Sequence, residues 1–175
     1  MKIKKAMILA AGLGKRMLPL TSNIPKPLIM IGSKNLLERS IELLIKIGIN
    51  ELVINTHYLP QKIDNFLKTK NYGISINVIH ERELLDTGGG IINATKKFEN
   101  NPFFVLNPDT IWNKNYYEEL KILENSYLKN NKPILLLVDK INSYDKSFKG
   151  DFNFTENRCV IRETSNQYIF TGAQI

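Results

Sequence analysis

The chain has little of several features that would define a class of protein. It holds a single cysteine, Cys159, in 175 residues, so no disulfide can form within it, as is usual in a reducing compartment. Its longest apolar stretches, such as residues 133–138, are far shorter than the roughly 20 residues that a membrane helix needs. The apolar run at residues 6–11, after a basic start, is too short for a secretory signal peptide. We therefore expect a cytoplasmic protein with no membrane partner.

The composition is that of a folded chain. Apolar residues make up 43% and charged residues 23% of the sequence, a balance that excludes intrinsic disorder. No internal repeat, linker or low-complexity segment interrupts the sequence, and its length fits one domain. Because the sequence stops at Ile175 directly after an expected strand, we expect a single domain over residues 1–175 that lacks its C-terminal segment.

Positive charge is in excess, with 24 Lys and Arg against 17 Asp and Glu, a net charge of +7. Such a surplus suits nucleic acid, a membrane surface or a small polyphosphate, and it also serves solubility alone. A nucleic-acid surface would gather basic residues on one face with aromatic residues between them. Here lysines are scattered through the expected helices. We therefore expect no nucleic-acid partner, and nucleic-acid binding ranks last among the hypotheses for function.

Apolar runs and helical patterns alternate along most of the chain. We expect strands over residues 6–10, 51–55, 74–79, 103–106 and 133–138. Helical spacing of apolar residues predicts helices over residues 35–47, 60–68, 90–98 and 116–128, with Gly48 as a C-cap. This alternation predicts an α/β fold, a three-layer α/β/α sandwich around a mainly parallel, Rossmann-like sheet. After Ser143, expected short strands over residues 151–154, 158–162 and 168–175 add an antiparallel extension, which makes the sheet mixed.

The segment after the first expected strand is rich in glycine and positive charge, but it matches neither common nucleotide-binding motif. Gly12 and Gly14 begin a GxGxxG pattern, yet Met17 takes the place of the third glycine and Pro19 interrupts the helix that should follow. The P-loop pattern needs four residues before its Gly-Lys pair, and here Leu13 alone separates Gly12 from that pair. The segment is therefore a glycine loop of another kind, or an ordinary surface turn.

Three cations accompany this loop. Lys15 and Arg16 follow its second glycine, and Lys26 stands between Pro25 and Pro27, which stiffen the backbone around it. Glycine lets backbone N–H groups approach a phosphate closely, and arginine offers a planar fork of donors. Together these residues predict a site for a small polyphosphate; the alternative is solvated surface charge.

Ligands of an open α/β sheet bind beyond the carboxyl ends of its strands. Polar residues follow three further expected strands, at residues 55–57, 81–90 and 107–109, so we expect four clusters at one edge of the sheet. Asp109 is the best candidate ligand for Mg²⁺, which takes one or two carboxylates together with substrate phosphates; the alternative is a solvated turn residue. The three successive glycines at 88–90 would each cost a helix about 1 kcal/mol against alanine, so close approach to a ligand explains them better than a hinge does.

Three motifs near the start of the chain, Ala10-Ala-Gly-x-Gly-x-Arg16, Pro19-Leu-Thr21 and Pro25-Lys-Pro-Leu28, resemble the signature of the sugar-1-phosphate nucleotidyltransferases. This signature is highly specific, and the resemblance covers essentially the whole chain. It implies the nucleotidyltransferase fold, which is similar to the GT-A fold, and it implies an Mg²⁺-dependent enzyme. Such enzymes join a nucleoside triphosphate to a sugar 1-phosphate and release pyrophosphate.

The resemblance implies that Arg16, Lys26 and Asp109 are catalytic. Arg16 and Lys15 would bind the leaving pyrophosphate, Lys26 would bind the α-phosphate or the sugar phosphate, and Asp109 would hold Mg²⁺. Pro108 stands where the family usually has glycine or serine, which stiffens the turn and leaves the metal ligand in place. The family's second metal carboxylate falls in a segment after the end of this sequence.

The resemblance also implies which residues contact the nucleotide and the sugar. The nucleotide would be held by Ala10, Ala11, Gly12, Gly14, Lys15, Asn55, Thr87, Gly88 and Gly89. Glu163 and Gly172 would lie near the sugar, although a strand-edge charge and a turn glycine explain them equally well. Residues 84–91, 107–112 and 55–58 most resemble the N-acetylmuramate-1-phosphate uridylyltransferase branch, with the mannose-1-phosphate guanylyltransferases close by. The implied reaction joins UTP to N-acetylmuramate 1-phosphate for the cell wall; the alternatives are the guanylyl reaction and a module that binds a sugar nucleotide without catalysis.

Four further residues fit a structural role better than a chemical one. We expect His57 to be a polar loop residue that lines the pocket and His80 to have no partner. Trp112 should lie in the core, and Cys159 should be a small apolar residue inside a strand.

Overall fold

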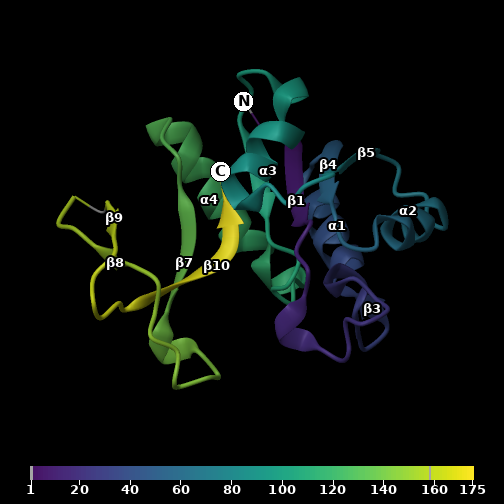
Figure 1. Ribbon diagram of the computed structural model, residues 1–175. Coiled ribbons are helices and arrows are strands. Elements are labelled where there is room, and N and C mark those ends of the chain that lie inside the picture. Colours follow the sequence, from purple (N-terminus) through teal and green to yellow (C-terminus); the bar gives the residue numbers. More distant parts are fainter. Residues whose placement is uncertain (1, 158) are drawn as a thin grey trace.

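The computed structural model describes residues 2–157 and 159–175 and is built around a six-stranded sheet (Figure 1). Its strands lie in the order β5 (Ser75–His80), β4 (Glu51–Thr56), β1 (Lys5–Ala10), β6 (Phe103–Leu106), β10 (Tyr168–Gln174) and β7 (Leu135–Asp139). The first four run parallel, whereas β10 is antiparallel to both of its neighbours. The expected mixed, mainly parallel sheet is confirmed.

Helices cover both faces of this sheet. The α-helices are α1 (Leu36–Ile47), α2 (Pro60–Lys68), α3 (Asp86–Ala94) and α4 (Tyr117–Asn130). On one face, α1, α2 and α4 pack with Ile8 of β1 in the larger core cluster, and on the other α3 and Phe98 pack with Met7 in a smaller cluster. Met7 and Ile8 belong to different clusters because successive side chains of a strand point to opposite faces. The structure is thus the predicted three-layer α/β/α sandwich. Within the described residues, no helix is long and apolar enough to cross a membrane.

Helix α1 shows how the sequence sets the ends of an element. Asn35 lies at its N-cap, where the side-chain Oδ1 accepts a hydrogen bond of 2.8 Å from the backbone N–H of Glu38. Gly48 ends the helix with φ at 101°, in the left-handed region that favours glycine. Between these caps, Ile41 and Leu44 are fully buried in the larger cluster. Both the helix and its glycine cap are confirmed.

Most predicted elements are confirmed with bounds shifted by one or two residues, but the glycine-rich helix differs. Helix α3 begins at Asp86 rather than at residue 90, so the glycines lie inside its first turns, and it ends at Ala94 before the separate 3-10 turn Lys96–Phe98. Gly90 is buried, and a Cβ at this position would lie 2.8 Å from Oε1 of Glu81. The predicted start was wrong because helix propensity counts against a glycine whose missing side chain is what allows this close packing.

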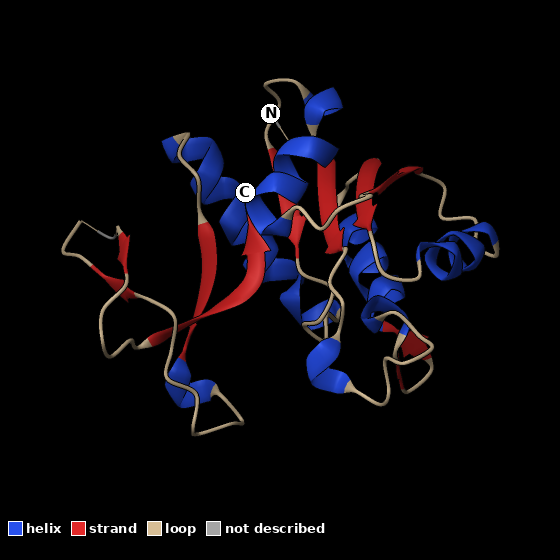
Figure 2. Cartoon of the chain, viewed as in Figure 1, coloured by secondary structure: helices blue, strands red, loops and turns tan. Residues whose placement is uncertain are grey.

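The segment after Ser143 also differs from the expected extension. Strand β10 is not added at the edge of the sheet but lies between β6 and β7. Strands β8 (Asn153–Phe154) and β9 (Val160–Ile161) pair in a small antiparallel sheet of their own, which Figure 2 shows apart from the helices. Residue 158, part of a predicted strand, lies outside the described residues. A further hairpin that was not predicted, β2 (Met30–Ile31) and β3 (Lys34–Asn35), precedes α1.

Cys159 does not lie inside a strand. It is exposed and precedes β9, where its backbone N–H donates a hydrogen bond of 3.1 Å to Oγ1 of Thr155. The prediction of a buried strand residue was wrong because a sheet of two strands with two residues each has no interior in which to bury a side chain.

Candidate active site

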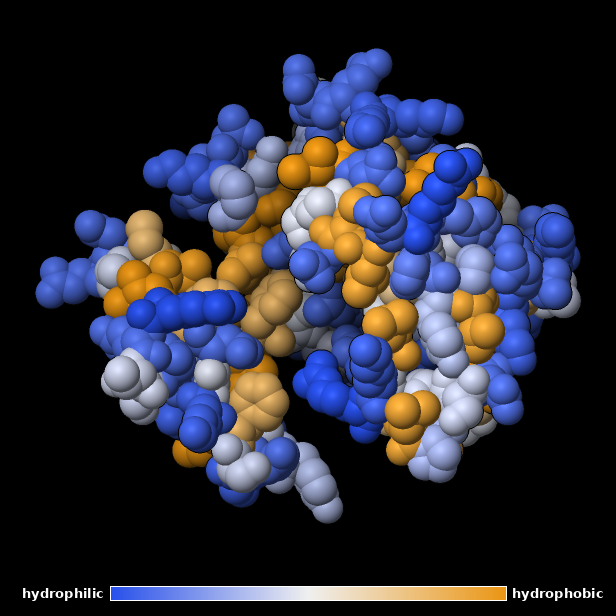
Figure 3. Space-filling model, in the orientation of Figure 1, coloured by the Kyte–Doolittle hydropathy of each residue, from blue (hydrophilic) through white to orange (hydrophobic). Residues whose placement is uncertain are grey.

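A cleft of about 460 Å³ opens beyond the carboxyl ends of β1, β4 and β6 and beside the start of α3. All residues that line this cleft lie between Leu9 and Asp109 in the sequence. In the space-filling view, a wider hollow separates the part of the chain that carries β7 to β10 from the body built on β1 and α1 (Figure 3). Residues from all four expected polar clusters line the cleft, so they do converge at one edge of the sheet. Of the predicted site residues, the lining includes Ala10, Ala11, Gly12, Gly14, Lys15, Arg16, Lys26, Asn55, Thr87 and Asp109.

The two glycines of the loop after β1 differ in what the fold requires of them. Gly14 has φ at 65°, and a Cβ there would lie 2.9 Å from Cγ2 of Thr21, so the fold itself requires glycine. Thr21 holds the loop in turn, since its Oγ1 donates a hydrogen bond of 2.9 Å to the carbonyl of Gly14. A Cβ on Gly12 would meet no protein atom within 4 Å. Gly12 therefore leaves open backbone on the cleft wall, where a ligand can approach closely.

The loop then places two cations on the wall of the cleft. Lys15 and Arg16 form the 3-10 turn Lys15–Met17, and both side chains are exposed. No ion pair joins either of them to another residue of the described chain. Their charges are therefore free to meet an anionic ligand.

Two oppositely charged side chains meet at the same cleft. Lys26 opens the 3-10 turn Lys26–Leu28, and Asp109 follows Pro108 after the end of β6. The Nζ of Lys26 lies 2.5 Å from Oδ2 of Asp109, although the residues are 83 positions apart in the chain. The two side chains are 26% and 39% exposed, so the pair borders solvent. The residue predicted to bind a phosphate and the residue predicted to bind a metal are thus in direct contact.

Asn55 is held by a buried network that the sequence pattern did not single out. Its Oδ1 accepts a hydrogen bond of 2.9 Å from the backbone N–H of Ala10, and its Nδ2 donates one of 2.7 Å to Oε1 of Glu81. Glu81 is 6% exposed, and its Oε2 accepts a bond of 3.2 Å from the N–H of Leu85. The network joins the ends of β1 and β4 to the start of α3, three elements that contribute residues to the cleft lining. The signal that could have found it is an acidic residue placed directly after a strand, at the edge where ligands bind.

Gly172 lies behind the cleft rather than in its lining. Its φ is 89°, and a Cβ there would lie 2.8 Å from Cβ of Asn107, which does line the cleft. The carbonyl of Gly172 accepts a hydrogen bond of 2.7 Å from the N–H of Asn107, and the hydroxyl of Thr110 donates one of 2.6 Å to the carbonyl of Thr171. Strand β10 therefore braces the turn that carries Asp109. A contact of Gly172 with a sugar stays a prediction.

Three other predicted site residues also lie outside the lining. Glu163 follows β9, and its carboxylate accepts a hydrogen bond from the side-chain amide of Asn153 in β8. Gly88 and Gly89 lie in the first turns of α3, and a Cβ on Gly88 would meet no atom within 4 Å, so this glycine borders open space. Their contacts with the sugar and the nucleotide stay predictions.

The two histidines differ from their expected environments. His57 does not line the cleft; its Nδ1 lies 2.9 Å from the carbonyl oxygen of Glu81. His80 has a partner, because α2 brings Oδ2 of Asp64 to 3.2 Å from its Nε2. Trp112 is fully buried in the larger cluster, so its prediction as a core residue is confirmed.

Known proteins are similar in sequence to this chain over much of its length. The family model described as Nucleotidyl transferase matches residues 5–141. A probable mannose-1-phosphate guanylyltransferase 1 of Oryza sativa subsp. japonica is 41% identical over 112 residues, which cover 61% of this chain and 31% of that protein. The N-acetylmuramate alpha-1-phosphate uridylyltransferase of Caulobacter vibrioides is 38% identical over 113 residues, which cover 62% of this chain and 47% of that protein. This chain therefore spans less than half the length of either relative.

Solved structures share the fold. HddC from Yersinia pseudotuberculosis, complexed with GMP-PN, has a TM-score of 0.77 at 28% identity, with 98% of this chain and 76% of that chain covered. A UDP-glucose pyrophosphorylase complexed with UDP-glucose has a TM-score of 0.78 at 20% identity, with 98% and 75% covered. The second likeness supports the fold alone. Together with the family match over most of the sequence and the cleft described above, these findings establish that the chain belongs to the Nucleotidyl transferase family.

Proposed function

We propose that the chain transfers a nucleotidyl group from a nucleoside triphosphate to a sugar 1-phosphate, which gives a nucleoside diphosphate sugar and pyrophosphate. The observation that carries this proposal is the cleft itself, where Lys15, Arg16 and Lys26 gather beside Asp109. Three cations and a carboxylate suit a triphosphate bound together with a divalent cation. The names of both relatives, a guanylyltransferase and a uridylyltransferase of sugar 1-phosphates, support the same class of reaction.

The reaction needs no nucleophilic side chain, because an oxygen of the sugar phosphate is itself the nucleophile. It attacks the α-phosphorus in line, a new P–O bond forms, and the bond to the oxygen that bridges the α- and β-phosphates breaks, so pyrophosphate leaves with that electron pair. Lys15 and Arg16 bind the leaving pyrophosphate, and Lys26 binds the α-phosphate or the sugar phosphate. Such chemistry depends on positioning and charge neutralisation. Pro25 and Pro27, both buried, hold the backbone on each side of Lys26.

Mg²⁺ is the cofactor that we propose for this cleft. Among residues 2–157 and 159–175, no group of three or more His, Cys, Asp and Glu side chains could hold a metal ion. Mg²⁺ does not need such a group, because it commonly binds through one or two carboxylates together with substrate phosphates. Asp109, on the wall beside the three cations, fits that mode of binding. When bound, the ion would neutralise charge on the phosphates.

UTP and N-acetylmuramate 1-phosphate are the substrates that we propose. Residues 84–91, in which Asp86 precedes Thr-Gly-Gly-Gly, and the 38% identity to the Caulobacter uridylyltransferase support this choice. The 41% identity to the rice protein supports the alternative, GTP with mannose 1-phosphate. Pocket contacts worth roughly 1 to 3 kcal/mol decide between such substrates.

A screen for pyrophosphate release tests both the class and the substrate. UTP, GTP, dTTP and CTP would each be paired with N-acetylmuramate, mannose and glucose 1-phosphates in the presence of Mg²⁺. We expect the highest rate with UTP and N-acetylmuramate 1-phosphate; a highest rate with GTP and mannose 1-phosphate would select the alternative. Calorimetric binding of a nucleotide sugar without pyrophosphate release from any pair would instead favour a binding module that does not catalyse.

A further inference from the structure

We infer that the ion pair between Lys26 and Asp109 makes the binding of the divalent cation and of the nucleotide depend on each other, so that the site selects the metal–nucleotide complex over either component alone. The inference rests on the proposed function, which gives Lys26 a phosphate and Asp109 a cation as ligands. It goes beyond that function because it concerns the order and the selectivity of binding rather than the reaction.

In the unliganded cleft, the two groups satisfy each other. The Nζ of Lys26 and Oδ2 of Asp109 are 2.5 Å apart, within charge-assisted hydrogen-bond distance. The neighbouring residues Pro25, Pro27 and Pro108 are buried, so the backbone on both sides of the pair is held in place. A ligand of either group must therefore turn a side chain away from its partner rather than move a loop.

Each ligand alone meets an opposing charge. A free divalent cation that approaches Asp109 must displace the ammonium group of Lys26, which also repels it. A metal-free nucleotide that approaches Lys26 must displace the carboxylate of Asp109, which repels the phosphates in the same way. Both penalties act in a cleft that is only partly open to water, where screening is weaker than in bulk solvent.

The metal–nucleotide complex meets neither penalty. When both components bind, Lys26 exchanges a carboxylate for a phosphate and Asp109 exchanges an ammonium group for a metal ion, so every charge keeps an opposite partner. The ligand that binds first breaks the ion pair, so the second ligand does not have to break it. The first ligand therefore improves binding of the second. By thermodynamic linkage this coupling is reciprocal, so it is measurable from the metal side and from the nucleotide side.

The same cleft offers matched controls for both partners. Lys15 carries the same charge as Lys26 on the cleft wall but forms no ion pair with a described residue. Asp86 likewise carries the charge of Asp109 on the cleft wall and forms no ion pair within the described chain. Substitution of a control residue changes the net charge of the cleft equally but leaves the Lys26–Asp109 pair intact.

Metal binding is tested by titration with Mn²⁺ in the absence of nucleotide, and electron paramagnetic resonance measures the concentration of free ion. We expect Lys26→Ala to bind Mn²⁺ roughly threefold to fivefold more tightly than the wild type does, the range that loss of a partly exposed ion pair permits. Lys15→Ala should give a smaller gain, which measures the effect of net charge alone. Asp109→Asn should lose this Mn²⁺ site, which identifies the ligand.

The nucleotide side is tested by calorimetry of UTP and GTP binding in the presence of a chelator. We expect Asp109→Asn to bind metal-free nucleotide more tightly than the wild type by a similar factor, because Lys26 is released, and Asp86→Asn to show a smaller gain. The inference is overturned, while the proposed function stands, if the wild type binds metal and nucleotide but the variants gain no more affinity than their controls. That means equal Mn²⁺ affinity for Lys26→Ala and Lys15→Ala, and equal nucleotide affinity for Asp109→Asn and Asp86→Asn. A wild-type chain that binds neither Mn²⁺ nor nucleotide, even when the two are supplied together, would overturn the proposed function and the inference together.

Discussion

Two regions of the chain, the sheet around the cleft and residues 143–167, are built in different ways. Around the cleft, β1, β4 and β6 are buried along most of their length, and helices pack on both faces. In residues 143–167, the strands β8 and β9 have two residues each and no buried position, and Tyr144, Phe148 and Val160 are exposed. Figure 2 shows most of this second region standing apart from the α-helices.

The difference teaches what the cleft depends on. Several of its polar side chains lie at or after the ends of strands whose backbones are fixed by a buried sheet, so residues far apart in the sequence, such as Asn55 and Glu81, come within 2.7 Å of each other. The second region connects to this framework through β10, which re-enters the sheet and places Gly172 against Asn107. Chemistry should therefore depend on the first region, and stability on it far more than on the second.

The largest effect should come from the cations. We expect Arg16→Ala to lower turnover roughly 10²-fold to 10³-fold, as loss of one donor to a developing charge does in other enzymes. The side chain is exposed, so the free energy of unfolding should stay close to that of the wild type. Lys149→Ala, which removes an exposed cation of the second region, is the control and should leave turnover unchanged. Equal losses in steady-state turnover for both variants would remove the contrast between the regions.

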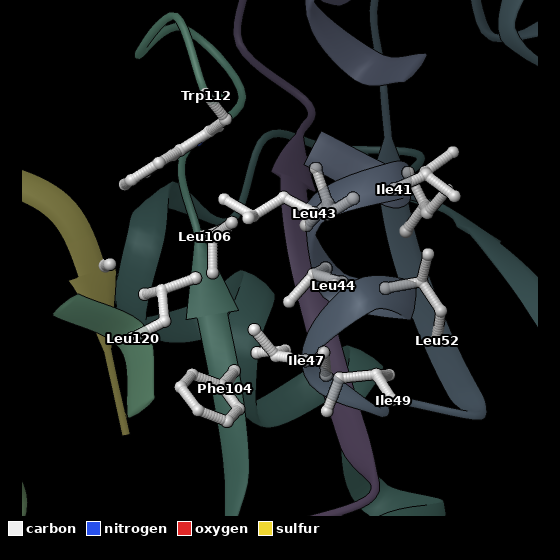
Figure 4. Close-up of a cluster of buried hydrophobic side chains, with 14 of the residues drawn as sticks. Ile41, Leu43, Leu44, Ile47, Ile49, Leu52, Phe104, Leu106, Trp112 and Leu120 are labelled. Atoms are coloured by element: carbon white, nitrogen blue, oxygen red, sulfur yellow. The ribbon is translucent and has the colours of Figure 1, made fainter. Parts of the chain in front are cut away.

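Stability gives the next contrast. Leu44 is fully buried among the side chains that Figure 4 shows between α1 and the sheet, so Leu44→Ala should lower the free energy of unfolding by about 2 to 5 kcal/mol. Val160 is 40% exposed in β9, so Val160→Ala should change the free energy of unfolding by at most about 0.5 kcal/mol. Denaturant unfolding of both variants measures the difference. A larger loss for Val160→Ala would mean that the second region is part of the cooperative core.

In the loop after β1, Gly14 should matter for stability and Gly12 for nucleotide binding. Gly14→Ala should destabilise the chain by about 1 to 3 kcal/mol, because φ is positive there and the Cβ would clash with Thr21. Gly12→Ala should leave the free energy of unfolding within about 0.5 kcal/mol of the wild type, because its Cβ meets no protein atom. It should instead weaken nucleotide binding, measured by calorimetry. Unchanged affinity in a stable Gly12→Ala variant would show that no ligand approaches this backbone.

The smallest effect that we predict lies at the cap of α1. Asn35→Ala removes the hydrogen bond to the N–H of Glu38 and should lower the free energy of unfolding by about 1 kcal/mol. Asn35→Asp, which keeps an oxygen acceptor and places a negative charge at the helix N-terminus, should restore most of it. Thermal unfolding of the two variants tests this, and equal losses in both would show that the side chain acts through packing rather than as a cap.

Local sequence patterns predicted the parts of the fold that local physics decides. The strand over 103–106 and the helix over 60–68 agree with the observed bounds, because buried apolar runs and a proline in the first turn are local signals. The position of the cleft also followed from the sequence, because ligands of a parallel sheet bind at the carboxyl ends of its strands. These signals needed no knowledge of which strand lies beside which.

Features that depend on strand order or on distant contacts were not predictable in this way. The pattern of β10 identifies a strand, but nothing in it indicates insertion between β6 and β7. The hydrogen bond between Asn55 and Glu81 depends on the pairing of β4 with β5. The contact of Lys26 with Asp109 requires the turn at residues 26–28 to lie beside the loop that follows β6. The β2–β3 hairpin has strands of two residues, too short for a periodic pattern to show.

The most direct test of the central claim is pyrophosphate release by the purified chain with UTP, N-acetylmuramate 1-phosphate and Mg²⁺, compared with the same assay on Lys26→Ala. The account predicts release by the wild type and a loss of roughly 10²-fold or more in the variant, because Lys26 acts on the reacting phosphates. The free energy of unfolding should differ by at most about 1 kcal/mol between the two chains, because the ion pair that the variant loses is partly exposed. Near-normal turnover of Lys26→Ala, or no release by the wild type from any pair of nucleotide and sugar 1-phosphate, would contradict it.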